Sequence, residues 1–350
     1  MTKHLYIHIP FCKNICSYCD FTRIKTCDFN LINDYCDEII KQVELTSIKN
    51  QYETIYIGGG TPNYIPNQIL NKFLSKISKF LDFNNEYEFT IECNPEFLTL
   101  EQARILKSNF INRVSIGAQI LNDKILKLLN RNHNTLDITN AIQNSRVVGI
   151  KNISLDFIYN LPFMTIKDID QIFEFINKYK IPHISFYSLE LKENSILTKQ
   201  KHILNNELEE KQLLYILECF KKLNYHRYEI SNWCISDKYK SKHNIAYWLT
   251  KDWKGIGKGA HGFEYHCLYN VTWSNYGWNI NCETLSLKEY YFQVLMMGLR
   301  LVNGINISIS PYKDAYEMYK NKIKNCTINN NYLSCNNVDI LDDILIELLN

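Results

Sequence analysis

The chain has 350 residues, a formal net charge of +2 and 46% hydrophobic residues, so it is long enough for one large core and a smaller second one. A nearly neutral chain without a basic run lacks the electrostatic footprint of a nucleic-acid-binding protein. No apolar stretch reaches about 18 residues, and the start MTKHLYIHIP lacks the basic-then-apolar order of a signal peptide. We therefore expect a cytoplasmic protein without a transmembrane segment and without nucleic acid as a partner.

The first 230 residues alternate short β-branched or aromatic runs with longer segments of helical periodicity, which predicts successive βα units on a parallel sheet. Six such units are too few to close an eight-stranded barrel, so we expect an α/β fold with a partial (β/α)6 barrel. The expected strands are Leu5–Ile9, Thr54–Ile57, Glu88–Glu92, Arg113–Ile116, Ile153–Ile158 and His183–Ser188. The expected helices are Leu31–Ile48, Gln68–Leu81, Leu100–Ser108, Asp123–Leu129, Thr135–Gly149 and Ile166–Lys178.

The remaining chain changes character after a long helix predicted over Asn206–Leu223. The aromatic and glycine-rich residues 231–284 are expected to connect two domains through loops and β-hairpins. Residues 285–350 predict a small, mainly helical domain. Its elements are helices at Leu287–Leu301 and Tyr312–Lys324, a short hairpin near Thr327–Ser334 and a terminal helix.

Cys12, Cys16 and Cys19 form a C-x-x-x-C-x-x-C run directly after the first strand. Three thiolates at this spacing can hold three irons of a [4Fe–4S] cluster and leave the fourth iron open to a second molecule. Structural zinc and simple core packing are the alternatives; His8 is a nearby fourth zinc ligand, but no second Cys/His pair of suitable spacing follows. We expect the nine other cysteines to be reduced thiols without a disulfide framework.

Glycines and carboxylates follow the next strands. Gly58–Thr61 precedes a helix, so its backbone N–H groups can approach a small charged ligand, although the P-loop pattern is absent. Glu92 and Asp156 stand at strand ends that face the reaction site in such barrels. Gly257, Gly259 and Gly262 match G-x-G-x-x-G, but the segment that follows has strand character, so tight turns are the better interpretation.

Ten segments in order carry a family resemblance: YIHIPFCKNICSYCDF, IGGGTPNYI, TIECNPE, RVSIGAQ, NRNH, ISLDFIYNLP, SFYSLE, YEISNW, HNIAYW and GIGKGAHG. With them the chain resembles the radical S-adenosylmethionine (SAM) proteins, and within these the group related to oxygen-independent coproporphyrinogen III oxidase. The resemblance runs almost end to end and includes YYFQVLMMGLRLVNGINI of the small helical domain.

The resemblance implies that the open iron binds the amino and carboxylate groups of SAM, and that the reduced cluster cleaves SAM to a 5′-deoxyadenosyl radical. The implied cluster ligands are Cys12, Cys16 and Cys19. Residues of four expected strands, one arginine and two tyrosines would surround SAM: Gly59, Gly60 and Thr61 at its methionine end, Glu92, Gln119, Arg131 and Asp156 at its charged and hydroxyl groups, and Tyr6 and Tyr18 against the cluster and ligand.

Two departures separate this chain from the oxidases, which carry a fourth cysteine where Phe21 stands and a longer extension before the cluster loop. His243 to Tyr247, HNIAY, resembles the H-N-x-x-Y signature of HemW-type haem chaperones. An imidazole can ligate haem iron, and Tyr247 offers a flat apolar surface to a porphyrin. This resemblance implies a haem-binding protein that delivers haem to apoproteins such as respiratory cytochromes, with peripheral contact at the inner membrane. The alternative is the oxidase itself, which decarboxylates coproporphyrinogen III.

Three glycine positions of the family carry other residues here: Asn130, which precedes Arg131, and Asn160 and Phe163, which follow the Asp156 strand. Asparagine tolerates positive φ moderately well, whereas phenylalanine does not. We therefore expect a SAM pocket that is altered on one side, and whether SAM is cleaved or only bound stays open.

Overall fold

The computed structural model describes residues 1–274 and 277–349, and its centre is a large β-sheet. In this described part, twelve strands follow the order β14-β13-β12-β11-β1-β4-β5-β6-β7-β8-β10-β9. Six neighbouring strands run parallel, as the alternating sequence pattern predicts. They are β1 (His4–Ile9), β4 (Thr54–Gly59), β5 (Glu88–Cys93), β6 (Arg113–Gln119), β7 (Asn152–Tyr159) and β8 (His183–Ser188).

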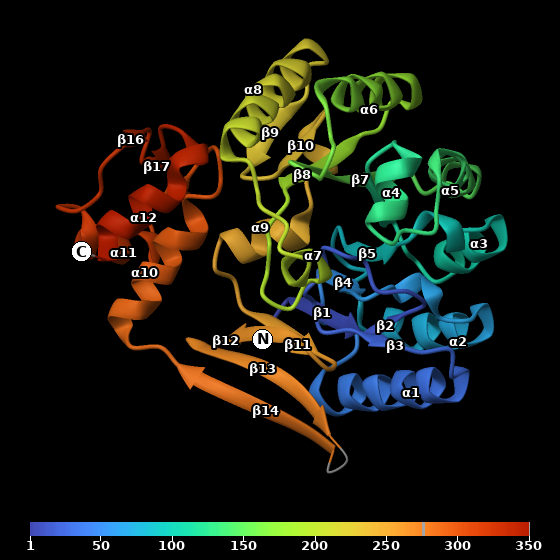
Figure 1. Cartoon of the computed structure of the whole chain (residues 1–350). Helices are drawn as coiled ribbons and strands as arrows, with labels where there is room; N and C mark the ends of the chain where they lie inside the picture. The colour runs from blue at the N-terminus through green and yellow to red at the C-terminus, as the bar shows by residue number, and fades with distance from the viewer. Residues whose placement is uncertain (275–276, 350) are drawn as a thin grey trace.

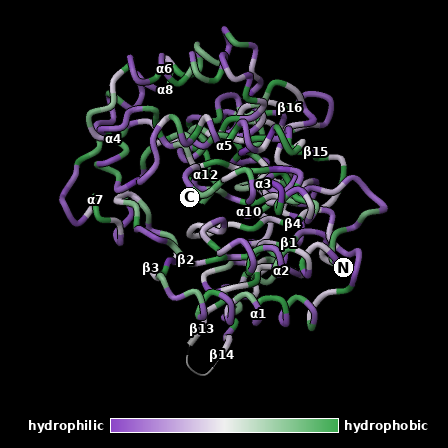
Figure 2. Tube along the Cα trace, turned by 90° about the vertical axis from the view of Figure 1, so that its right-hand side faces the viewer, coloured by the Kyte–Doolittle hydropathy of each residue, from purple (hydrophilic) through white to green (hydrophobic). Residues whose placement is uncertain are grey.

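Helices between these strands cover the outer face of the sheet (Figure 1). They bury apolar strand residues such as Ile7, Ile55 and Ile91 in the main core, while their outer sides are hydrophilic (Figure 2). The helices are α1 (Phe29–Thr46), α2 (Asn67–Ile77), α3 (Leu100–Ser108), α4 (Asp123–Leu128), α5 (Thr135–Val147) and α6 (Ile166–Tyr179), with 3-10 turns η1 (Pro62–Tyr64), η2 (Ser78–Phe80) and η3 (Pro95–Phe97). After β8 follow α7 (Ile196–Lys199), where the Leu197 N–H donates to the Ser17 carbonyl, and α8 (Asn206–Lys222).

The described residues between 226 and 284 extend the same sheet on both sides. β9 (His226–Glu229) and β10 (Asn232–Cys234) continue it beyond β8, and η4 (Asp237–Tyr239) follows. β11 (Trp253–Ile256) pairs in parallel with β1, and the antiparallel strands β12 (His261–Glu264), β13 (Cys267–Ser274) and β14 (Gly277–Thr284) follow it. The expected hairpins are confirmed, whereas helix α9 (Lys242–Trp248) was not expected in this region.

The turn between β11 and β12 explains two of the three spaced glycines. Gly257 and Gly259 have φ values of +104° and +88°, which an L side chain rarely adopts. A Cβ at Gly262 would lie 2.1 Å from the Tyr269 ring on the next strand. The glycines therefore serve tight turns and close strand packing, as the sequence indicates.

A smaller core forms in the C-terminal part, which lies beside the sheet (Figure 1). Val294, Leu295, Leu299 and Leu345 are among its buried residues. Its elements are α10 (Leu287–Gly298), α11 (Tyr312–Tyr319), a small sheet of β15 (Ile305–Asn306), β16 (Cys326–Asn329) and β17 (Tyr332–Cys335), the turn η5 (Val338–Ile340) and α12 (Leu341–Leu349). The mainly helical C-terminal part is confirmed.

One expectation about the cysteines is wrong. Cys267 on β13 and Cys282 on β14 are joined as a disulfide, with their Cα atoms 6.3 Å apart. Chain order did not reveal this pair because the two cysteines meet only when the β13–β14 hairpin forms. The other cysteines outside the cluster run are free.

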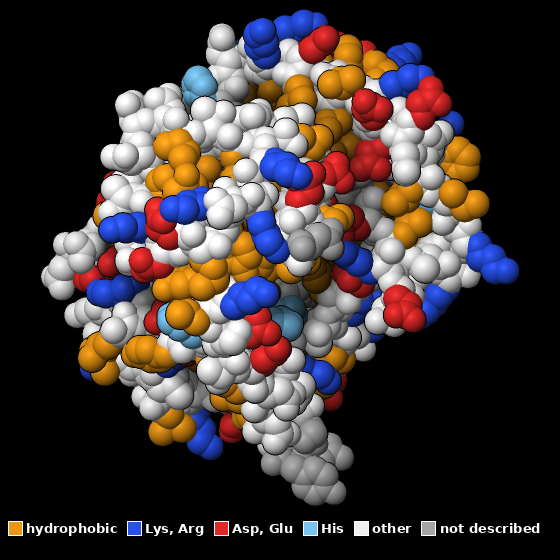
Figure 3. Space-filling view, turned by 90° about the vertical axis from the view of Figure 1, so that its left-hand side faces the viewer, with side chains coloured by type: hydrophobic (Ala, Val, Ile, Leu, Met, Phe, Trp, Pro, Cys, Tyr) orange, Lys and Arg blue, Asp and Glu red, His pale blue; other side chains and the backbone are white. Residues whose placement is uncertain are grey.

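Among the described residues, no helix is both long and apolar enough to cross a bilayer. Figure 3 shows the face that carries the C-terminal helices, where hydrophobic side chains lie in separate patches among charged ones.

Candidate functional site

The three cysteines of the spaced run line one cavity at the carboxyl ends of the parallel strands. Cys12 ends the short strand β2 (Phe11–Cys12), which pairs with β3 (Ile24–Lys25), and the loop between these strands carries Cys16 and Cys19. The cavity measures about 130 Å³. Most of the residues expected to bind SAM also line it: Tyr18, Gly59, Gly60, Thr61, Glu92, Gln119, Arg131 and Asp156.

The donor set of this cavity fits an iron–sulfur cluster. Cys12, Cys16 and Cys19 line it together, and a cubane takes each of three thiolates on a different iron and leaves the fourth iron open. Thr61 Oγ1 lies 3.6 Å from Cys12 Sγ, and Arg131 Nη1 lies 3.5 Å from Cys16 Sγ. Both donors can stabilise sulfur that carries negative charge.

Burial raises the pKa of Cys12 and raises the pKa of Cys19 to about 11. The protein alone therefore holds these two side chains as thiols at neutral pH, and a bound metal must supply the charge that favours thiolates.

The glycine turn after β4 leaves room that any side chain would fill. A Cβ on Gly60 would lie 2.7 Å from Cys12 Sγ, and a Cβ on Gly59 would lie 2.8 Å from His8 Nε2. Gly59 also has a φ of +117° and donates its N–H to Glu92 Oε2 at 3.1 Å. The glycines thus bring backbone against the cysteine loop and orient the Glu92 carboxylate.

Glu92, on β5, is the carboxylate nearest this turn. Besides the Gly59 N–H, it accepts a hydrogen bond from the Tyr56 hydroxyl at 2.9 Å. Desolvation raises the pKa of Glu92 to about 7, with a smaller contribution from the negative charge of Asp156, and the Tyr56 hydrogen bond opposes this rise. The carboxylate is therefore close to its titration midpoint at neutral pH, and a cationic or N–H-rich ligand would favour its ionised form.

Asp156, on β7, is held by two serines. Ser115 and Ser154 donate to it at 3.0 and 3.1 Å. Burial raises its pKa, while the Arg113 guanidinium in the sheet interior opposes that rise. Gln119 reaches the same cavity because β6 has an irregular register between Gly117 and Gln119, where Gln119 has a φ of +64°.

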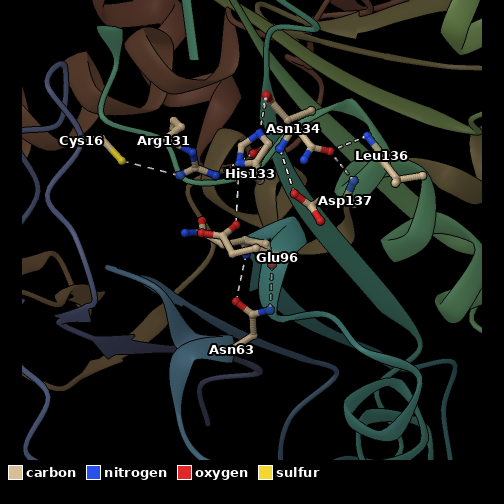
Figure 4. A network of polar contacts seen from close by, with 11 residues as sticks. Cys16, Asn63, Glu96, Arg131, His133, Asn134, Leu136 and Asp137 are labelled. Atoms are coloured by element: carbon tan, nitrogen blue, oxygen red, sulfur yellow. Dashed lines mark hydrogen bonds and ion pairs between the residues drawn. The ribbon is translucent and has the colours of Figure 1, made fainter. Parts of the chain in front are cut away.

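Arg131 belongs to a polar network at one side of the cavity (Figure 4). Its guanidinium donates to the Gly117 carbonyl at 2.7 Å as well as to Cys16. Close by, His133 Nε2 lies 3.1 Å from the Ala118 carbonyl, and Nδ1 lies 3.6 Å from the Glu96 carboxylate. Neither Glu96 nor His133 was expected at this site from the sequence. The NRNH motif could have indicated His133, but its link to Glu96 needs the folded chain.

The two expected tyrosines lie in different places. Tyr18 lines the cavity, as expected. Tyr6 is not among the cavity-lining residues; its hydroxyl bonds to His8 Nδ1 at 2.9 Å, and its ring centroid lies 6.2 Å from that of Tyr56. Tyr6 therefore lies inside the sheet, in contact with residues that support the cavity.

His243 and Tyr247 lie at the opposite, amino-terminal end of the parallel strands. The His243 imidazole is only 1% exposed, and each ring nitrogen has a partner: Nδ1 lies 2.7 Å from Thr54 Oγ1 and Nε2 lies 2.7 Å from the Tyr247 hydroxyl. Glu88 accepts from the N–H groups of Lys242 and His243, which fixes the start of α9. In this arrangement His243 has no free nitrogen for an iron.

The three replaced glycine positions all have positive φ: +58° at Asn130, +59° at Asn160 and +64° at Phe163. The two asparagines form compensating bonds, because Asn130 Nδ2 donates to the Ile15 carbonyl of the cysteine loop and Asn160 Nδ2 donates to Glu209. The Phe163 side chain is 82% exposed. The backbone of these turns thus keeps the shape that glycine permits, and the side chains do not enter the cavity.

A second cavity of about 470 Å³ adjoins the first and shares Tyr18, Cys19, Phe21 and Tyr187 with it. It extends between β8, α8 and the C-terminal part, whose contributions are Val338, Asp339, Leu341 and Asp342. Phe21, at the position of the oxidases' fourth cysteine, is 64% exposed at the border of the two cavities. Space therefore exists beside the cysteine loop for a second, larger molecule.

An open α/β sheet with a three-cysteine loop and a glycine turn at its carboxyl edge defines the class of radical SAM proteins. The model of the Radical SAM superfamily matches residues 6–176. The fold is similar to that of coproporphyrinogen III oxidase (HemN) from Escherichia coli, with a TM-score of 0.79 at 17% identity, covering 99% of this chain and 90% of that one.

Relatives of known name identify the family within the radical SAM proteins to which the chain belongs. The chain is 32% identical over 336 residues to the haem chaperone HemW of Lactococcus lactis subsp. lactis, covering 91% of this chain and 84% of the relative. It is 36% identical over 262 residues to HemW of Buchnera aphidicola subsp. Schizaphis graminum, covering 74% and 69%. The chain belongs to the HemW family of radical SAM proteins, which confirms the resemblance inferred from its motifs.

Proposed function

We propose that this protein is a haem chaperone that also holds a [4Fe–4S] cluster and SAM. The observation that carries the proposal is the 32% identity to a protein named haem chaperone over 91% of this chain. The cavity around the cysteines supports the cofactor part, because its donors match a cluster with one open iron and its carboxylates match a sulfonium-bearing amino acid.

The bound cluster and SAM would supply one-electron chemistry at the open iron. The chain's own residues do the binding and orienting. Cys12, Cys16 and Cys19 would hold the cluster. Glu92, Gln119, Arg131 and Asp156 would hold the polar groups of SAM, with Gly59, Gly60, Thr61 and Tyr18 around them and Tyr6 behind them.

For haem, His243 and Tyr247 are the proposed contacts. Because both His243 nitrogens are engaged inside the sheet, ligation of haem iron there requires α9 to leave its place. The partners would be haem-requiring apoproteins such as respiratory cytochromes, reached from the cytoplasm with peripheral contact at the inner membrane.

Anaerobic reconstitution with iron, sulfide and haem tests the proposal. We expect about four irons and about four sulfides per chain, together with stoichiometric haem that passes to an added apocytochrome. Cys12→Ser should lose most of the iron, while Cys27→Ser, which removes an exposed cysteine outside the cavity, should keep it. A protein that binds no haem, or binds it without transfer, would contradict the chaperone role.

A second assay separates the chaperone from the oxidase. The reconstituted protein is incubated anaerobically with SAM, a reductant and coproporphyrinogen III, and protoporphyrinogen is measured. We expect no turnover. Substantial turnover would replace the chaperone proposal by the oxidase.

A further inference from the structure

A chain of three side chains connects the cysteine cavity to α9 through the sheet interior. Tyr56, in the middle of β4, donates its hydroxyl to Glu92 Oε1 at 2.9 Å. The same ring stacks on the His243 imidazole, with 5.2 Å between centroids and 27° between planes. Tyr56 therefore touches both the carboxylate of the cavity and the histidine of the HNIAY segment.

His243 is itself rigidly held. Thr54 and Tyr247 engage its two nitrogens, and Glu88 accepts from the backbone N–H at its position. A side chain fixed at both nitrogens and stacked on a neighbour restricts the rotation of that neighbour. The Tyr56 ring therefore has one position in which its hydroxyl reaches Glu92.

We propose that Tyr56 and His243 are positioning residues of the SAM pocket, with His243 supporting the Tyr56 ring and Tyr56 orienting the Glu92 carboxylate toward the amino group of SAM. This inference rests on the proposed SAM binding. It gives the HNIAY histidine a role, while α9 stays docked, that does not require contact with haem.

The titration of Glu92 provides a readout that a merely structural residue would not change. Charged and titratable groups face Glu92 from six elements: Tyr6 on β1, Tyr56 on β4, Arg113 on β6, Asp156 on β7, Tyr187 on β8 and Tyr247 on α9. Among the tyrosines, Tyr56 is the one that donates a hydrogen bond to the carboxylate, so its hydroxyl favours the ionised form.

The experiment measures SAM affinity of the reconstituted holoprotein by equilibrium dialysis between pH 6 and pH 9. Tyr56→Phe should bind SAM about tenfold more weakly at pH 7, and the midpoint of its pH dependence should move up by about one unit. Tyr52→Phe is the matched control, since its hydroxyl bonds to Ser47 away from the cavity, and it should behave as wild type. The titration of SAM's own amino group is common to all variants and cancels.

His243 is tested by two substitutions. His243→Ala should weaken SAM binding about as much as Tyr56→Phe, whereas His243→Phe, which keeps a flat ring below Tyr56, should recover part of the affinity. Unchanged SAM affinity and pH midpoint in Tyr56→Phe and His243→Ala would overturn the inference, and so would equal losses in His243→Ala and His243→Phe. Should His243→Ala fail to fold, Tyr56→Phe decides alone. Wild-type protein that binds no SAM would instead refute the proposed SAM binding. This outcome is distinct from a failure of the positioning role, in which wild-type protein binds SAM and the variants bind it equally well.

Discussion

Phe163 occupies a backbone conformation that suits glycine. Its φ is +64° and its side chain is 82% exposed, so little contact energy offsets the strain. A left-handed conformation costs an L residue roughly 1–2 kcal/mol. Glycine avoids this strain, but its greater flexibility in the unfolded chain cancels a part of the gain in stability. Phe163→Gly should therefore raise the free energy of unfolding by about 0.5–1 kcal/mol in urea denaturation.

The matched control for this prediction is Ile203→Gly. Ile203 is 84% exposed but has no positive φ, so glycine there should give no stabilisation. Equal effects of the two substitutions would show that the strain at Phe163 is not the cause.

Glu92 predicts a pH dependence of SAM binding. Its pKa is raised to about 7, so the ionised fraction grows as pH passes upward through 7. An ionised carboxylate accepts hydrogen bonds from an amino group better than a protonated one. SAM affinity measured by calorimetry should therefore increase from pH 6 to pH 8. Glu92→Gln cannot ionise, so its weaker binding should keep only the part of this increase that comes from the amino group of SAM itself. A rise of the same size in Glu92→Gln would assign the pH dependence to another group.

The residues of the cavity could largely be assigned from motifs because most of them stand at or near the carboxyl end of a strand, and parallel strands bring these ends together. Tyr56, Glu96 and His133 could not be assigned in this way. Their roles depend on contacts between strands, such as the hydroxyl of Tyr56 on β4 reaching Glu92 on β5, and residue spacing does not contain that information.

At the scale of elements, α9 shows how tertiary contacts decide local structure. HNIAYW is rich in aromatic and β-branched residues, so its composition suggested loops or hairpins. The helix forms because Ser241 accepts from the Asn244 N–H and Glu88 accepts from Lys242 and His243. Glu88 lies more than 150 positions earlier in the chain, whereas regular elements such as α3 and β8 match the expected bounds because their signals are local.

This cap predicts the effect of Glu88→Gln. Hydrogen bonds to a charged group are worth about 1.5–3 kcal/mol, and an amide retains only part of that value. The amides of α9 should exchange with deuterium about tenfold faster, as measured by mass spectrometry. Glu86→Gln is the control, because Glu86 makes an exposed ion pair with the Lys242 side chain, worth about 0–1 kcal/mol. Similar exchange in both variants would argue against the cap.

Glu88→Gln and Glu86→Gln also test whether His243 contacts haem. A ligand that needs α9 released binds more tightly when release costs less. If His243 ligates haem iron, Glu88→Gln should therefore bind haem about tenfold more tightly than Glu86→Gln in a Soret titration. Equal haem affinities would place the haem elsewhere.

At the scale of the whole molecule, the C-terminal part joins the sheet through a partly buried ion pair. Arg227, on β9, contacts Asp339 at 2.8 Å, with side-chain exposures of 14% and 22%, and lies over the Trp233 ring. The residues at this junction also line the larger cavity. The association of the two parts and the shape of that cavity therefore depend on the same contacts.

Asp339→Asn tests this junction. An exposed ion pair contributes about 0–1 kcal/mol to the free energy of unfolding, and breaking a buried one costs about 3–5 kcal/mol. The contribution of a partly buried ion pair lies between these values. We expect a loss of about 1–2 kcal/mol in the free energy of unfolding. Asp343→Asn, on the exposed side of α12, should change it by less than about 0.5 kcal/mol. An Asp339→Asn protein as stable as wild type would show that the apolar contacts alone hold the junction.

The α/β architecture and the mainly helical C-terminal part followed from periodicity, since helical and strand repeats differ in the chain itself. The continuation of the sheet by β11 did not, because its pairing with β1 joins residues about 250 positions apart. The Cys267–Cys282 bond was missed for a similar reason, since it depends on the β13–β14 hairpin.

The positions of α9 and of the two adjoining cavities have a consequence for the molecules that bind. α9 is held at the amino end of the parallel strands, whereas the two cavities meet near the carboxyl end and share Tyr18, Cys19, Phe21 and Tyr187. Molecules bound in the two cavities would therefore lie against each other, so filling the larger cavity would slow the departure of a molecule from the smaller one.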